Sequence, residues 1–135
     1  MTKIEFSCPP YPSNNRKWRA MRMSGGKWMP AWKVKYIEQK QYQQDVGLRI
    51  LSALSTARYK RPRWKKATVK IRLYLSRKGR HDLQNYASAK WLLDALTHAG
   101  IIIDDSYDVI GRPDVDFGGI DRANPRCEVT VRRVT

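Results

Sequence analysis

Residues 76–108 read SRKGRHDLQNYASAKWLLDALTHAGIIIDDSYD, and the rest of the chain is organised around this stretch. It opens with a cationic turn and reaches its first acid at Asp82, a suitable residue for a helix N-cap or first turn. Apolar residues at four-residue spacing (Leu83, Ala87, Trp91 and Ala95) predict a helix from there to Ala99 that packs one face, with Gly100 as its stop. An apolar run, Ile101–Ile103, then leads to the carboxylate pair Asp104–Asp105.

The chain is strongly basic, with 27 Lys and Arg against 12 Asp and Glu and a formal net charge of +15 over 135 residues. This balance favours a polyanionic partner, because cations that neutralise phosphates release condensed counterions. The sequence contains no long apolar run and no secretory leader pattern, so we expect a cytoplasmic protein without membrane contact. Its length and hydrophobic fraction of 41% predict one domain, residues 1–135.

Two cysteines, Cys8 and Cys127, lie far apart in the sequence. A disulfide between them is one possibility, and two buried thiols are the expectation in a chain without export signals. Neither cysteine belongs to a CxxC motif, and His81 and His98 are the only histidines. The sequence therefore does not favour a structural zinc site.

Hydrophobic periodicity predicts an α+β fold. Alternation favours four strands and a turn after the third, while a 3.6-residue period favours a helix from Val34 or Tyr36 to about Ser55. The expected strands are Lys3–Ser7, Ala67–Leu75, Asp108–Asp116 (followed by a turn at Phe117-Gly118-Gly119) and Arg126–Val134. The apolar side of the helix is expected to carry Ile37, Tyr42, Val46, Leu48, Ile50, Leu51 and Leu54. This order predicts a small mixed or antiparallel sheet with two main helices packed on one side.

Two N-terminal segments carry side chains suited to nucleic acid. Residues 13–16 read SNNR, and these polar groups can bond phosphate or, as the alternative, the backbone of their own loop. In residues 16–35, seven Lys and Arg interleave with three Trp, a mixture that suits phosphates and exposed bases. A surface hairpin whose Trp residues anchor it to the core would give the same pattern, and the two interpretations are compatible. The candidate DNA-binding residues are Asn14, Asn15, Arg16, Lys17 and Arg19, together with Arg77, Lys78 and Arg80 of the cationic turn.

The acids of the central stretch suggest metal chemistry. Cleavage of a phosphodiester with Mg²⁺ needs carboxylate oxygens on the metal and a cation near the phosphate. Asp82, Asp104, Asp105 and Lys90 could supply both if the turn after Gly100 folds the acid pair back. The alternative is a helix cap at Asp82 and a solvated turn at Asp104–Asp105, with Lys90 in an ordinary helix pair with Asp94.

Four segments in order resemble the RusA family of Holliday-junction resolvases, which are small, basic and often prophage-borne endonucleases. They are PPYPSNNR (residues 9–16), RHDLQN (80–85), KWLLDAL (90–96) and AGIIIDD (99–105). The resemblance implies an α+β homodimer that binds four-way DNA junctions and nicks two strands with Mg²⁺ or Mn²⁺. It implies metal ligation by Asp82 and Asp105 and a catalytic role for Lys90, with Asp94 matching the acid of the same family segment. Asp104, ahead of Asp108, is the candidate if a further acid completes the site.

The chain departs from the family pattern in two places. Gln84 stands where the family has the second acid of its D-L-D-N motif, so a ligand is expected to have lost its charge, although its carbonyl can still bind Mg²⁺. About two additional residues separate Asn85 from Lys90, which would rotate Lys90 relative to Asp82 unless the helix starts later. A basic DNA- or RNA-binding protein with weak or no cleavage is therefore the alternative function. A scaffold whose charge serves solubility alone is less favoured.

Overall fold

The computed structural model describes residues 2–56, 60–76 and 83–134. Its main sheet has the strand order β1-β6-β4-β5, in which β6 is antiparallel to both β1 and β4, and β4 is parallel to β5. The sheet is therefore mixed. Its strands are β1 (Lys3–Cys8), β4 (Ala67–Leu75), β5 (Asp114–Ile120) and β6 (Arg126–Arg133).

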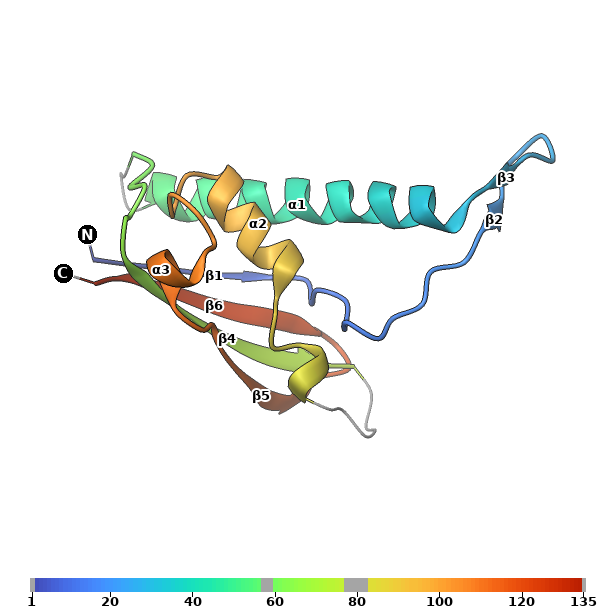
Figure 1. Cartoon of the computed structure of the whole chain (residues 1–135). Coiled ribbons are helices and arrows are strands. Elements are labelled where there is room, and N and C mark those ends of the chain that lie inside the picture. The colour runs from blue at the N-terminus through green and yellow to red at the C-terminus, as the bar shows by residue number, and fades with distance from the viewer. Residues whose placement is uncertain (1, 57–59, 77–82, 135) are drawn as a thin grey trace.

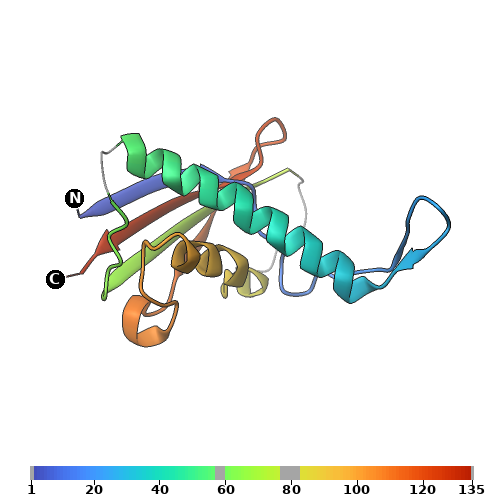
Figure 2. The ribbon, with the colours of Figure 1, turned by 90° about the horizontal axis from the view of Figure 1, so that it is seen from above.

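Two main helices cover one face of this sheet, and a short hairpin extends from the end of the longer one (Figures 1 and 2). The mixed α+β class expected from the sequence is confirmed. Among the described residues, no helix is both long enough and apolar enough to cross a bilayer. The remaining elements are β2 (Met21–Arg22), β3 (Trp28–Met29), α1 (Ala31–Thr56), the 3₁₀-helix η1 (Leu83–Asn85), α2 (Lys90–His98) and α3 (Tyr107–Ile110).

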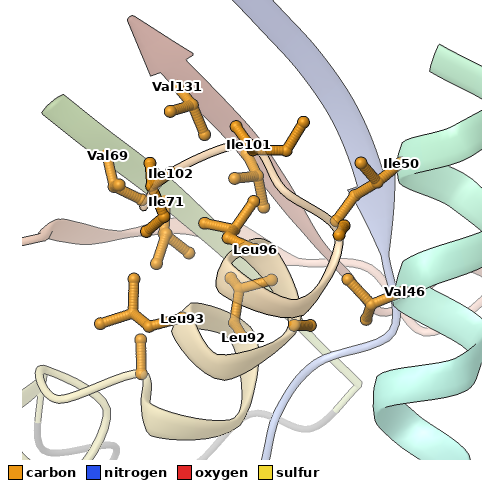
Figure 3. Packing of buried hydrophobic residues seen from close by; sticks show 14 of the residues in the cluster. Val46, Ile50, Val69, Ile71, Leu92, Leu93, Leu96, Ile101, Ile102 and Val131 are labelled. Carbon is orange, nitrogen blue, oxygen red and sulfur yellow. The ribbon is translucent and has the colours of Figure 1, made fainter. Parts of the chain in front are cut away.

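The core lies between the sheet and the two helices, where alternate residues of β4 and β6 meet one face of each helix (Figure 3). Burial of each large aliphatic side chain contributes about 1.5–3 kcal/mol, so this layer supplies most of the favourable free energy of folding. Because parallel strands cannot be joined by a hairpin, the chain between β4 and β5 has to cross over the sheet. That crossover carries η1, α2 and α3. Core residues at 0–1% exposure include Val46, Ile50, Val69, Ile71, Leu92, Leu96, Ile101, Ile102 and Val131.

The strands at both ends of the chain match the sequence prediction closely. β1 extends one residue beyond the predicted range, and β6 ends one residue before the predicted end. Cys8 lies directly opposite Cys127 across the β1–β6 ladder, and both are buried, free thiols, as expected. The central strand Ala67–Leu75 is confirmed in full, with Val69, Ile71 and Leu73 buried on one face.

The predicted helix from Asp82 to Ala99 is wrong in its first half, because α2 begins only at Lys90. The carbonyls that would close its first turns are used elsewhere: the Asn14 amide donates to Asn85 O at 2.7 Å, and the Tyr11 hydroxyl donates to Tyr86 O at 2.7 Å. Ala89 then takes a left-handed conformation, with φ 46°, before the helix starts. Leu83 and Ala87, expected on the packed face, are consequently exposed.

Two further predictions need correction. The predicted strand at Asp108–Asp116 divides into α3 and the start of β5, with Pro113, which has no N–H to donate, between them. The predicted turn at Phe117-Gly118-Gly119 lies inside β5 instead. Gly118 is needed there because a Cβ at this position would collide with the ring of Tyr74 on β4.

Helix α1 begins earlier than predicted, and its buried side is narrower. The carbonyl of Pro30 accepts the amides of Lys33 and Val34 at 3.0 and 3.1 Å, which starts the helix at Ala31. Val46, Ile50 and Leu54 are buried as predicted, but Leu48 and Leu51 are 68% and 44% exposed. They lie on a side of the helix that turns away from the sheet.

Candidate functional site

Lys90, the first residue of α2, joins two carboxylates that come from different parts of the crossover. Its Nζ lies 3.1 Å from an oxygen of Asp105 and 3.2 Å from an oxygen of Asp94. Asp94 is one helical turn along α2, the expected helix pair, whereas Asp105 arrives after Gly100 reverses the chain with φ 77°. The turn therefore folds Asp105 back onto the start of α2.

Electrostatic interactions between Lys90 and its carboxylate partners favour the charged forms of Lys90 and Asp105. Desolvation of the partly buried Asp105 carboxyl raises its pKa, but the hydrogen bond and the charge of Lys90 outweigh that effect, so the pKa is lowered overall. The hydrogen bonds to Asp105 and then Asp94 raise the pKa of Lys90. Both shifts favour the charged forms of Lys90 and Asp105.

The other predicted acids and Gln84 have different positions. Asp104 is exposed, and its carboxylate accepts the backbone N–H of Asp105 at 2.9 Å. Asp108 is an exposed residue in the first turn of α3. Gln84 is an exposed residue of η1. Four predicted site residues, Arg77, Lys78, Arg80 and Asp82, lie outside the described residues.

The N-terminal loop after β1 is attached to the segment that leads into α2. Tyr11 is buried between two prolines and donates to the carbonyl of Tyr86; burial raises its pKa, so its hydroxyl keeps its proton. The side-chain oxygen of Asn14 accepts the Ser88 hydroxyl at 3.0 Å, in addition to the backbone bond between Asn14 and Asn85. These contacts bring the sequence segments 9–16 and 80–96 together in space.

A cavity of about 180 Å³ forms where this loop meets the starts of α1 and α2. Arg16 and Lys35 line it beside Lys90, so three cations surround one opening. Its wall is aromatic: the Trp18 and Trp91 rings stack with centroids 5.6 Å apart, and the Arg16 guanidinium lies 4.0 Å above Trp18. The three cations suit this cavity to a phosphate group, while the Trp18 and Trp91 rings are already stacked on each other.

The remaining predicted DNA-binding residues lie on the same loop. Asn15 accepts the Ser13 hydroxyl at 2.6 Å, and Arg16 also pairs with Glu38 of α1 at 3.1 Å. Lys17 and Arg19 are exposed. The loop therefore presents cations to solvent, and its asparagines help to hold its shape; binding of phosphate by residues 13–16 stays a prediction.

Sequence reasoning missed the residues that hold the loop and the cavity together. Periodicity places Tyr86 and Trp91 on the predicted helix, with Trp91 on its packed face, and indicates no role for Tyr11 or Ser88. One available signal was the tyrosine enclosed by prolines at Pro10-Tyr11-Pro12, since a ring held in an extended segment needs a partner for its hydroxyl. No sequence pattern points to that partner, which is 75 residues away.

The donor set is compatible with Mg²⁺ but incomplete within the described residues. Mg²⁺ is commonly held by one or two carboxylates, several waters and the phosphates of its substrate. Asp105, ionised and only partly buried, can be one such carboxylate, and Asp94 or Asp104 can be a neighbour. In the described part of the chain no group of three or more His, Cys, Asp and Glu could hold a metal ion, and Asp82 lies outside that part.

Comparison with protein families and with curated proteins finds no family model and no curated sequence that matches this chain.

Proposed function

We propose that this protein is a Mg²⁺-dependent, structure-selective DNA endonuclease that resolves four-way junctions by paired nicks. One observation carries the proposal: Lys90 lines the cationic cavity and is also the residue on which Asp94 and Asp105 converge. A protein that only binds nucleic acid gains nothing from carboxylates beside its phosphate site, because they repel phosphate. A phosphodiesterase needs acids and cations together.

Each residue has a role that follows from its position. Lys90 keeps Asp105 ionised, which a hard divalent cation requires of its ligand. The ammonium group of Lys90 and the guanidinium of Arg16 offset the negative charge of the scissile phosphate. Mg²⁺, or Mn²⁺ in its place, would polarise that phosphate and lower the pKa of a bound water. Asp82, Asp104 and Gln84 are the proposed further ligands.

The resemblance to RusA-like resolvases supports the choice of substrate and the proposal of a homodimer. Two matched nicks in a two-fold junction suit a two-fold enzyme. We propose a bacterial or phage-encoded protein that is cytoplasmic and associated with the nucleoid, where such a substrate arises during recombination and repair.

A labelled four-way junction and a linear duplex of the same sequence test the proposal when each is incubated with protein and Mg²⁺, then Mn²⁺. We expect symmetrical nicks near the branch of the junction and none in the duplex. Sedimentation should give a dimer, alone or on the junction. Nicking of both substrates alike would contradict structure selectivity.

The alternative is a DNA- or RNA-binding protein that no longer cleaves. Gln84 favours it, because a neutral group stands where the resembled family has an acid. In the same experiment this function predicts tight junction binding without nicks under either metal. Failure to bind any branched DNA would remove the endonuclease and the DNA-binding alternative, and would leave only RNA binding.

A further inference from the structure

Helix α1 carries one continuous face through two environments. Spacings of three and four residues align positions 32, 36, 39, 43, 46, 50 and 54. At the far end of this face Val46, Ile50 and Leu54 are at most 3% exposed, because the sheet lies beneath them. At its beginning Trp32 and Tyr36 are 71% and 54% exposed.

The reason is that the helix extends beyond the sheet. Figures 1 and 2 both show the start of α1, with the β2–β3 hairpin attached, projecting past the ends of the strands. We call residues 19–40 the arm. The arm adds Trp28 at 63% exposure and Met21 at 52% to the rings on α1. It therefore presents flat aromatic surface that the rest of the described chain does not cover.

The charge of the arm identifies what could cover it. Glu38 is its one acid and pairs with Arg16, against six cations: Arg19, Arg22, Lys27, Lys33, Lys35 and Lys40. A second copy of the arm would bring the same positive charge, so electrostatic repulsion disfavours an interface between two arms. Lys35 also lines the cavity beside Lys90, so the cations of the arm continue into the candidate site.

Cations and rings are arranged in pairs along the arm. The Arg22 guanidinium lies 5.2 Å from the Trp28 ring centroid, and Lys40 Nζ lies 5.5 Å from that of Tyr36. A base stacked on such a ring would have its own phosphate within reach of the neighbouring cation. Paired bases are already stacked in a duplex, so this arrangement suits nucleotides that are unpaired.

We propose that the arm binds an unpaired segment of a DNA strand, stacking bases on Trp28 and Trp32 while the arm cations pair with the flanking phosphates. The inference rests on the proposed function in taking DNA as the polyanion. It adds that the protein holds single-stranded nucleotides beside the branch, along a path that leads from the arm to Lys90.

Tryptophan fluorescence with a short oligo(dT) tests this inference without any need for cleavage. The oligonucleotide should quench wild-type emission, and Trp28→Ala with Trp32→Ala should remove most of that quenching. Loss of the two rings should weaken oligo(dT) binding by roughly 10-fold or more. Trp28→Phe with Trp32→Phe keeps stacking surface and should restore most of the affinity.

Leu48→Ala is the matched control, because Leu48 is comparably exposed at 68% but lies on the same helix away from the arm. It should leave oligo(dT) affinity unchanged, and circular dichroism should show all the variants folded. An alanine pair that binds oligo(dT) as tightly as the wild type overturns the inference.

Two other results would also overturn it, each by identifying a different occupant. If the alanine pair converts a dimer to a monomer in sedimentation, the arm is an interface between copies. If vesicles containing phosphatidylserine, and not oligo(dT), change the emission of Trp28 and Trp32, the arm binds a lipid surface. If the protein cuts no junction but binds oligo(dT) through the two rings, the inference about the arm stands and the proposed nuclease function fails. If it cuts junctions but binds oligo(dT) without the rings, only the inference about the arm fails.

Discussion

The chain has two cationic regions that differ in what surrounds the charge. At Lys90 the ammonium is held by two carboxylates, within a crossover that is tied to the N-terminal loop by hydrogen bonds. On the arm, cations accompany exposed rings, and its one acid is engaged with Arg16. Positive charge paired with acids is suited to position a reacting phosphate, whereas positive charge beside rings is suited to hold a strand. We therefore expect chemistry to depend on the first region and affinity on the second.

The largest effect should come from removing a carboxylate at Lys90. Asp105→Asn should reduce junction cleavage by roughly 100-fold or more, because it removes the negative charge of the proposed metal ligand. Junction binding should stay equal or tighten, since a repulsion toward phosphate disappears. Gel assays of cleavage and binding measure the two effects separately.

Asp114→Asn, which removes an exposed acid at the start of β5, is the matched control and should cleave normally. Asp82→Asn should behave like Asp105→Asn. Asp104→Asn should be nearly silent if Gln84 ligates the metal, and should cripple cleavage if Asp104 has replaced it. Normal cleavage by Asp105→Asn would mean that Asp105 is only an ion-pair partner of Lys90. It would contradict the expectation that chemistry depends on the Lys90 region.

The next largest effect concerns salt. Replacing Lys27 and Lys33 of the arm with Gln should lower the slope of log affinity against log salt by about 0.7–0.9 for each phosphate that the arm no longer neutralises. Lys65→Gln with Lys66→Gln, exposed residues before β4, is the control and should change the slope less. Titrations between roughly 50 and 200 mM salt measure both. Equal slopes for the two pairs would mean that the arm has no special share of the binding.

Gln84→Asp should have a smaller and opposite effect, an increase in activity. If Gln84 occupies the position of a ligand, restored charge should raise cleavage or lower the Mg²⁺ concentration that gives half-maximal rate. Asp should help more than Glu, because the resembled family has Asp there. No change in an active wild type would mean that another acid completes the site, with Asp104 the first candidate and Asp108 the second.

The smallest expected effect is on stability. Asp105→Asn should lower the free energy of unfolding by about 1 kcal/mol or less, because Lys90 is 65% exposed and water screens the pair. The lowered pKa of Asp105 makes this contribution present above the ordinary carboxyl value of about 3.9, and it is lost as pH falls through the folded pKa. Because the pKa of Lys90 is raised, the same stabilisation is lost again when Lys90 loses its proton, as pH rises above about 10.4 and through the folded pKa.

Urea unfolding of the wild type and Asp105→Asn at pH 7 and pH 3 measures this difference. The gap between the two proteins should narrow at the lower pH. A gap that widens on acidification would show that the pair does not carry the effect.

The sequence was most informative where periodicity and burial agree. Ala67–Leu75 alternates cleanly and lies at the centre of the sheet, so its prediction needed no tertiary information. The start of α2 could not be predicted, because the carbonyls of Asn85 and Tyr86 are taken by residues about 70 positions earlier. The prediction of a turn at Gly118 is wrong for a similar reason, because a glycine is required there by the close approach of the Tyr74 ring on the neighbouring strand.

The candidate site divides along the same line. Lys90 with Asp94 is a local helix pair and was predicted as such. That Asp105 would meet Lys90 depended on the direction of the turn at Gly100, which spacing does not determine. The stacking of Trp18 on Trp91 in the cavity wall could not be predicted, because the two residues come from segments far apart in the sequence. Trp32 lies on the same stripe of α1 as the buried Val46 and Ile50, yet it is exposed, because α1 extends beyond the sheet.

The parallel pairing of β4 and β5 also affects how the chain folds. The ion pair of Lys90 with Asp105 closes a loop of 15 residues, whereas the bond from Tyr11 to Tyr86 closes one of 75. Closing a longer loop costs more entropy and is slower. The ion pair of Lys90 with Asp105 should therefore form within the crossover before the N-terminal loop docks on it. Unfolding followed by tryptophan emission should then be faster in Tyr11→Phe than in Asp105→Asn, because contacts that form late act mainly on the unfolding rate. The cavity would be the last part of this molecule to exist, and the first to disappear when it begins to unfold.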